Sequence, residues 1–177
     1  MLTRIFLVGP MGAGKTAVGR QLARRLGFDF RDSDLEVETR TGVDIAFIFE
    51  KEGEAGFRRR EKEVLDAMTR LEGIVLATGG GVVLDSDNRA RLASRGYVVY
   101  LEAGIDQQLE RTRRGGRRPL LHTADPRAAL ETLMREREAL YLEIANFVVR
   151  TDGRRVAAVV AELAKHLGDR PRERTSS

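Results

Sequence analysis

The chain has 177 residues, a net charge of +4, and 42% hydrophobic and 33% charged residues. These values fit one domain with an ordinary core and exclude a disordered or fibrous protein. The chain holds no cysteine, which excludes disulfides and thiolate sites and favours a cytoplasmic location. We expect no membrane contact, because no apolar run approaches the roughly 20 residues of a membrane span.

The net positive charge leaves a nucleic acid as an alternative partner, because clustered arginines and lysines neutralise phosphates. Basic residues crowd at 111–118 and 170–174, and the few aromatic residues of the chain do not lie among them. We therefore expect no nucleic-acid partner and attribute the charge to a small polyanionic ligand such as ATP.

Apolar runs and helical periodicity alternate along the whole chain. Five short apolar runs predict buried strands at residues 5–8, about 28–31, 74–77, 98–101 and 147–150. Apolar residues at three- and four-residue steps predict helices at 15–26, 35–40, 45–49, 57–71, 86–95, 105–113, 126–144 and about 154–167. Gly53 and Gly56 separate the third helix from the fourth, and residues 113–118 are predicted to form a mobile loop.

Strands that alternate with helices specify a parallel sheet with helices on both faces, because parallel strands need crossover connections. The sequence has no internal repeat and no linker, so we predict a single domain over residues 1–168. Residues 169–177 are polar enough to form a frayed C-terminal tail.

A phosphate-binding motif lies between the first strand and the first helix. Residues Gly9 to Thr16 match G-x-x-x-x-G-K-[ST] at every specified position. The glycines let backbone N–H groups turn toward phosphate oxygens, and the helix N-terminus adds partial positive charge. In this motif Lys15 would sit between the β- and γ-phosphates, and the Thr16 hydroxyl would ligate Mg²⁺.

Two aspartates follow the second strand, where ligands bind in α/β sheets. Asp32 and Asp34 are spaced so that an extended backbone would send both side chains to the same side. One carboxylate can serve the metal and the other can accept the proton of an acceptor hydroxyl. The alternative is that they cap the helix predicted at 35–40, and capping is compatible with catalysis.

Arg137 occupies the apolar stripe of its predicted helix, and Arg58 lies at the edge of another stripe. A buried arginine is almost never unpaired, so a ligand anion or a protein carboxylate should meet it. An internal salt bridge, or an aliphatic stem along the core, stays open as the alternative. Together the two arginines could grip a substrate carboxylate through two-pronged hydrogen bonds.

Two further segments suit phosphoryl transfer. Arg118, in the arginine- and glycine-rich loop, could neutralise charge on the moving phosphoryl group, although a merely solvated basic loop is the alternative. The run Thr78-Gly79-Gly80-Gly81 at a strand end permits close approach of backbone to a ligand, although a tight turn would explain it equally well.

In this order the motifs resemble those of bacterial shikimate kinases over nearly the whole chain. The resemblance rests on Gly9 to Thr16, Asp32 to Asp34, Gly53 to Arg58, Thr78 to Gly81, Arg118 to Leu121, and Arg137 with Leu140 and Tyr141. It implies a three-layer P-loop NTPase fold like that of nucleoside-monophosphate kinases, with strand order 2-3-1-4-5 and a lid at about 112–125. It also implies transfer of the γ-phosphate of ATP to the 3-hydroxyl of shikimate, a step toward chorismate and the aromatic amino acids.

The resemblance implies a role for each matching residue. The ATP-binding residues would be Gly12, Ala13, Gly14, Lys15, Thr16, Ala17, Arg111, Arg118 and Arg154. The shikimate-binding residues would be Asp34, Arg58, Gly79, Gly80, Gly81 and Arg137, with the binding region at about 33–62. Thr16 and Asp32 would hold Mg²⁺, and the catalytic residues would be Lys15, Asp34 and Arg118.

Two other functions stay open. A kinase for another small polyol acid, such as gluconate, would share the fold and the phosphate loop, and only analogy argues against it. A nucleotide-binding regulatory module without turnover is disfavoured by the complete set of Lys15, Thr16, Asp32 and Asp34. We also expect a monomer whose ligands are small molecules.

Overall fold

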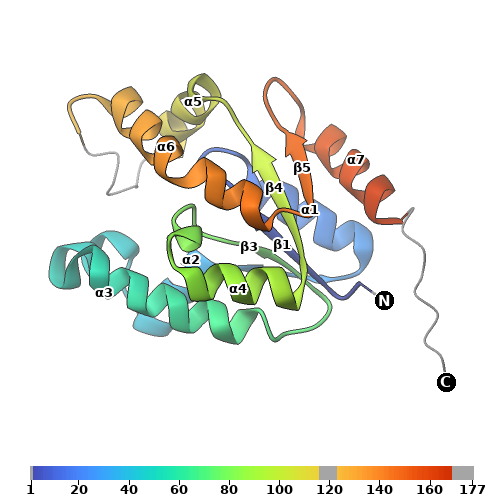
Figure 1. Ribbon diagram of the computed structural model, residues 1–177, viewed down its shortest axis with the longest axis horizontal. Coiled ribbons are helices and arrows are strands. Elements are labelled where there is room, and N and C mark those ends of the chain that lie inside the picture. The colour runs from blue at the N-terminus through green and yellow to red at the C-terminus, as the bar shows by residue number, and fades with distance from the viewer. Residues whose placement is uncertain (1, 116–122, 169–177) are drawn as a thin grey trace.

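The protein folds around a parallel β-sheet with helices on both sides (Figure 1). The computed structural model describes residues 2–115 and 123–168, and within them the sheet has five strands in the order β2-β3-β1-β4-β5. The strands are β1 (Arg4–Val8), β2 (Asp29–Asp32), β3 (Ile74–Ala77), β4 (Tyr97–Glu102) and β5 (Phe147–Arg150). All neighbouring strands pair in parallel, which confirms the predicted fold class and strand order.

Helices connect the strands and follow the predicted order. They are α1 (Lys15–Leu26), α2 (Ser33–Thr41), α3 (Ile45–Met68), α4 (Ser86–Arg95), α5 (Ile105–Gly115), α6 (Pro126–Ile144) and α7 (Val156–Gly168), with a short 3₁₀ turn η1 (Val82–Leu84). Aspartate side chains accept backbone hydrogen bonds at the N-termini of four of them, namely Asp32, Asp44, Asp85 and Asp125. Aspartate is a preferred residue at this position because its carboxylate satisfies otherwise unpaired N–H groups.

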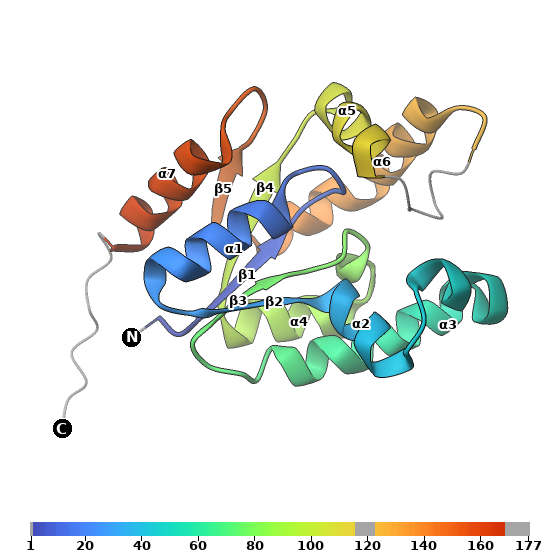
Figure 2. The ribbon, with the colours of Figure 1, turned by 180° about the vertical axis from the view of Figure 1, so that it is seen from behind.

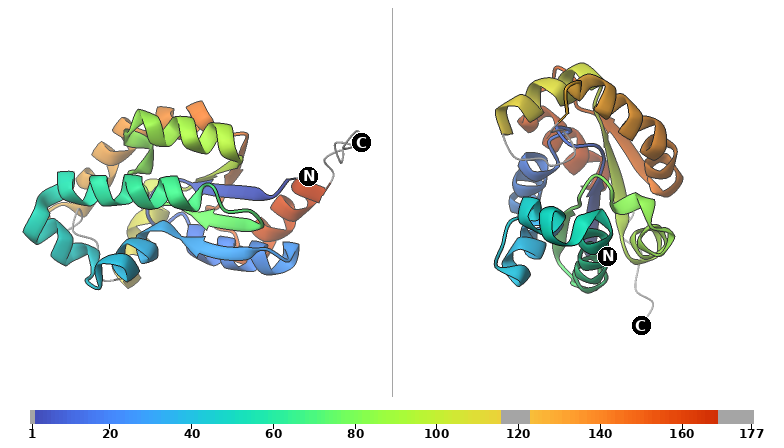
Figure 3. Two further views of the ribbon diagram at one scale, coloured as in Figure 1. Left: turned by 90° about the horizontal axis from the view of Figure 1, so that it is seen from below. Right: turned by 90° about the vertical axis from the view of Figure 1, so that its left-hand side faces the viewer.

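The sheet separates two apolar cores, since successive strand residues point to opposite faces. On β1, Phe6 and Val8 pack with α3, α4 and α6, whereas Ile5 and Leu7 pack with α1 and α7. Figure 2 shows α1 and α7 covering one face, and the views in Figure 3 show the sheet between the two helix layers. The layers hold the carboxyl ends of β1, β2 and β3 side by side, and the loops from these ends meet there.

Three predicted boundaries were wrong, and one of them is the end of α3, which lies at Met68 and not at residue 71. The break in α3 lies at Gly53 alone, which has φ 70°, whereas Gly56 is helical and buried. The absence of a side chain at Gly56 leaves room for Glu52, whose Cβ lies 2.3 Å from the position that a Cβ of Gly56 would take. The helix α5 continues through Gly115, so Arg113 and Arg114 are helical rather than part of a loop, and an Arg114–Glu110 ion pair at 3.0 Å supports the added turn.

Some predicted features fall outside the described residues. These are Arg118, most of the lid predicted at about 112–125, and the tail predicted at 169–177. Among the helices that the structure does describe, none combines the length and hydropathy needed to cross a membrane.

The turn after β1 depends on the absence of a side chain at Gly9, which has φ 145°. A Cβ there would lie 2.5 Å from the backbone oxygen of Leu101 on β4. We therefore expect Gly9→Ala to lower the free energy of unfolding by more than Gly42→Ala does. Gly42 also has a positive φ, but open space surrounds it, so its substitution should cost only about 1–2 kcal/mol. Urea denaturation of both variants checks this, and equal losses would contradict it.

Candidate active site

The phosphate loop joins β1 to the N-terminus of α1. Gly12 and Gly14 have φ values of 77° and 91°, a conformation that side chains disfavour, and Gly14 is the N-cap of α1. The helix therefore begins at Lys15 with its unpaired N–H groups and partial positive charge at the end of the loop. This arrangement suits an anion such as a phosphate group.

A cavity of about 260 Å³ lies over this loop. It is lined by Gly12, Gly14, Lys15, Thr16, Ala17, Asp32, Asp34, Thr78, Gly79, Gly80 and Arg111. The Lys15 ammonium donates hydrogen bonds to the carbonyl oxygens of Gly9 and Pro10, both at 2.7 Å. Arg111 reaches the loop from α5 and donates from Nη1 to the Gly12 oxygen at 3.0 Å. Two cations therefore lie beside the backbone amides, and we call this space the loop cavity.

Two predicted ATP-binding residues lie apart from the loop cavity. The Ala13 side chain is buried in the core that α1 and α7 form with the sheet. Arg154 pairs with Glu162 at 2.6 Å and donates to the Arg150 oxygen at 2.9 Å. Neither Ala13 nor Arg154 lines the loop cavity, so the ATP-binding roles of these two residues stay predictions.

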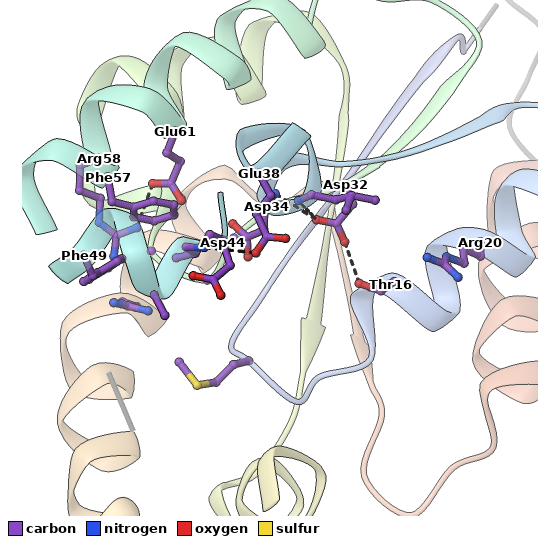
Figure 4. A pocket seen from close by; sticks show the side chains of 18 residues that line it. Thr16, Arg20, Asp32, Asp34, Glu38, Asp44, Phe49, Phe57, Arg58 and Glu61 are labelled. Carbon is purple, nitrogen blue, oxygen red and sulfur yellow. Dashed lines mark hydrogen bonds and ion pairs between the residues drawn. The ribbon is translucent and has the colours of Figure 1, made fainter. Parts of the chain in front are cut away.

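Asp32 contacts two elements at once. Its Oδ1 accepts hydrogen bonds from the N–H groups of Asp34 and Leu35, at 3.0 and 3.2 Å, and so caps α2. Its Oδ2 accepts a hydrogen bond from the Thr16 hydroxyl at 2.9 Å (Figure 4). Asp32 therefore caps α2 and also lies beside the phosphate loop, and the sequence analysis had found these two roles compatible.

A second cavity of about 490 Å³ adjoins the loop cavity, and we call it the acceptor cavity. Its walls come from α2, both segments of α3, the turn after β3, and Arg137 of α6. Figure 4 shows Arg58, Phe49 and Phe57 on one side of it, and Thr16 and Arg20 of α1 on the other. Thr16, Asp32, Asp34, Gly79 and Gly80 line both cavities. Asp34 thus lies where the two spaces meet.

The turn Gly79-Gly80-Gly81 is approached closely by four charged side chains. A Cβ at Gly79 would lie 2.8 Å from both Asp34 Oδ1 and Glu61 Oε2. At Gly80 it would lie 3.4 Å from Arg137 Nη1, and at Gly81 it would lie 2.3 Å from Arg58 Nη2. A Cβ at Gly79 or Gly81 would therefore displace the charged groups that lie against these two residues, whereas Gly80 has room for one.

The two arginines of the acceptor cavity differ in their partners. Arg58 pairs with Glu61 at 2.9 Å and with Glu54 at 3.2 Å, so the internal salt bridge left open by the sequence is present for this residue. Burial disfavours its charge, but the two carboxylates outweigh burial and raise the pKa of Arg58. Arg137 is only 3% exposed and forms no ion pair among the described residues, and its Nε, like that of Arg58, has no hydrogen-bond partner there. Arg137 therefore retains a donor for a ligand anion.

The site includes one buried carboxylate whose importance the sequence analysis did not recognise. Glu61 is 1% exposed, and only its Oε1 is paired, with Arg58; Oε2 has no partner in the described part of the chain. Burial raises the pKa of Glu61 above its ordinary value, although the charges of Arg58 and Arg137 oppose the rise. The available signal was a glutamate within the apolar stripe of a helix, three residues after Arg58.

The fold and the two joined cavities define a class, namely a P-loop kinase whose small acceptor binds at the same sheet edge as the nucleotide. The family model for shikimate kinase matches residues 11–168. A shikimate kinase from Aliivibrio fischeri is 53% identical over 166 residues, which cover 94% of this chain and 96% of that protein. The chain belongs to the shikimate kinase family.

Solved structures agree with this assignment. The shikimate kinase from Acinetobacter baumannii, solved in complex with shikimate, has a TM-score of 0.92 and 46% identity, covering 94% of this chain and 93% of its own. A deoxyadenosine kinase from M. mycoides with bound dCTP has a TM-score of 0.64 at 16% identity, covering 93% of this chain and 98% of its own. The second likeness shows the fold alone, which is shared with nucleoside kinases.

The raised pKa of Glu61 predicts a pH dependence of stability in the ligand-free protein. The folded state keeps the Glu61 proton at pH values where the unfolded chain, with a glutamate pKa of about 4.3, has released it. The free energy of unfolding of the native protein should therefore fall, relative to that of Glu61→Gln, as the pH rises from 5 to 8. Urea titrations at several pH values measure this difference, and a rise or a constant difference would contradict the prediction.

Proposed function

We propose that this chain transfers the γ-phosphate of ATP to the 3-hydroxyl of shikimate, which yields ADP and 3-phosphoshikimate. Membership of the shikimate kinase family supports this directly. The observation that carries the proposal is the junction of the two cavities, where Asp34 lies between the phosphate loop and the two arginines. The product then serves the route to chorismate and the aromatic amino acids.

The nucleotide phosphates would lie in the loop cavity. Backbone N–H groups of residues 12–17 and the Lys15 ammonium would neutralise the β- and γ-phosphates. Arg111 already contacts the loop through Gly12 and would lie on the nucleotide side. Arg118 would neutralise the moving phosphoryl group from the lid and Arg154 would lie beside adenine, and both roles rest on the resemblance.

Thr16 and Asp32 would hold the Mg²⁺ that accompanies ATP. Their oxygens are 2.9 Å apart and belong to a hydroxyl and a carboxylate, which are the ligand types that this hard cation prefers. The site offers few protein ligands, since the described residues hold no cluster of three or more His, Cys, Asp or Glu. This fits Mg²⁺, which is usually bound by one or two protein groups, water and substrate phosphates, and neutralises charge on them.

The acceptor cavity combines a positive end with a proton acceptor. Arg137 and Arg58 would bind the shikimate carboxylate, and the backbone of Gly79 to Gly81 would lie along the ring. Asp34 would accept the proton of the 3-hydroxyl of shikimate. The oxygen of that hydroxyl would bond to the γ-phosphorus while the bond from the γ-phosphorus to the bridging oxygen of ADP breaks. Asp34 is suited to this role because it lines both cavities.

The cytoplasmic location and the monomeric state stay proposals. The lack of cysteine is compatible with the first, and the size of the chain, which holds both cavities, is compatible with the second.

The choice of acceptor is tested by measuring ADP release with ATP and Mg²⁺ in the presence of shikimate or gluconate. We expect ADP release with shikimate and none with gluconate, because Arg58 and Arg137 match the carboxylate of shikimate and Asp34 matches its hydroxyls. Turnover with gluconate alone would assign the chain to another acid, and ATP binding without ADP release with either acceptor would indicate a regulatory module.

Replacement of Asp34 tests its part in proton transfer. Asp34→Asn should lower kcat by about 10²- to 10⁴-fold and leave ATP affinity nearly unchanged, because the variant loses the proton acceptor and keeps the phosphate loop. Glu36→Gln is the matched control, since Glu36 lies on the same helix and pairs with Arg40 at 2.8 Å. Near-normal turnover of Asp34→Asn would show that Asp34 is not the base.

A further inference from the structure

Tyr141 is a fully buried polar residue of α6 that the mechanism above does not use. Its hydroxyl donates a hydrogen bond to the carbonyl oxygen of Gly80, the central residue of the glycine turn. Its ring stacks on that of Tyr100 of β4, with centroids 5.1 Å apart and planes inclined by 27°. Tyr141 therefore joins three parts of the protein, namely α6, the sheet and the turn that lines both cavities.

Tyr141 also lies four residues after Arg137, so both side chains project from the same face of α6. Burial raises the pKa of Tyr141 to about 12, while the charge and hydrogen bonding of Arg137 are the largest opposing effects. The guanidinium thus acts on the same hydroxyl that is bonded to Gly80, and Arg137 Nη1 lies 3.4 Å from the position that a Cβ of Gly80 would take. The hydroxyl, the guanidinium and the turn form one contact group.

We infer that Tyr141 is a positioning residue for the acceptor, an inference that rests on the proposed function. Its hydroxyl fixes the Gly80 peptide, and Arg58 rests against the next residue, Gly81. The separation of the two guanidiniums, one on α3 and one on α6, is therefore set through the turn that Tyr141 holds. Tyr141 acts through these groups and need not touch the substrate itself.

The alternative is that Tyr141 serves only to pack α6 on the sheet. Its ring is suited to that role, since the stacking with Tyr100 needs no hydroxyl. A phenylalanine keeps the ring and removes only the hydroxyl, so Tyr141→Phe separates packing from positioning.

The chain offers a matched control in Tyr100→Phe. Tyr100 is buried and belongs to the same stacked pair, but its hydroxyl has no hydrogen-bond partner among the described residues. Both variants therefore lose a hydroxyl group from a buried ring of the same stacked pair. Only Tyr141→Phe also loses a hydrogen bond to Gly80.

The experiment is steady-state kinetics of the native protein, Tyr141→Phe and Tyr100→Phe, with shikimate and ATP varied in turn. We expect Tyr141→Phe to raise KM for shikimate by about three- to tenfold, which is the range for one net hydrogen bond, with kcat and KM for ATP changed less than about twofold. Tyr100→Phe should keep all three parameters within about twofold of native values.

Three results would overturn the inference. The first is an unchanged KM for shikimate in Tyr141→Phe, and the second is an equal rise in Tyr100→Phe. The third is loss of folding in Tyr141→Phe, seen by circular dichroism, which would make the hydroxyl a structural requirement. Failure of the proposed function itself looks different, because the native protein would then release no ADP with shikimate.

Discussion

Close packing of charge around a turn without side chains is the constraint on which this structure depends. Asp34, Glu61 and Arg58 approach the backbone of Gly79 and Gly81 within the space that a Cβ would need, and Arg137 lies at contact distance from that position at Gly80. They come from α2, from the next helix α3 and from the distant α6, and the parallel sheet gathers these elements and the turn after β3 at one edge. A substitution in the turn would therefore disturb both signs of charge together.

The two arginines of the acceptor cavity lie among several carboxylates that line the same space, namely Asp32, Asp34, Glu38, Asp44 and Glu61. Arg58 is neutralised by Glu61 and Glu54, which offsets the cost of its partial burial. The Nε of each arginine lacks a partner in the described structure, but Arg137 is more deeply buried and, unlike Arg58, forms no ion pair there. The difference suits a site in which one guanidinium is held in place by the protein and the other completes its hydrogen bonds with the substrate.

Much of this could be predicted from the sequence, because the signals are local. The phosphate motif, the aspartate caps and the strand runs each depend on neighbouring residues, and the structure confirms their elements. The pairing of Arg58 with Glu61 joins residues three apart on one helix and could have been found from their spacing, whereas the bond from Tyr141 to Gly80 depends on a tertiary contact that no spacing reveals. The error at Gly56 arose because a glycine is compatible with a helix as well as with a break, and the side chain of Glu52 packs where a Cβ would lie.

The double engagement of Asp32 has a consequence for how the two substrates communicate. One oxygen of this carboxylate anchors the first turn of α2, which carries Asp34, and the other faces Thr16 on the nucleotide side. Any cation that draws on the second oxygen pulls on the same rigid group that orients the helix. Under the proposed function, binding of Mg²⁺ with ATP would thereby be linked to the orientation of Asp34, and a change at position 32 would alter both steps together.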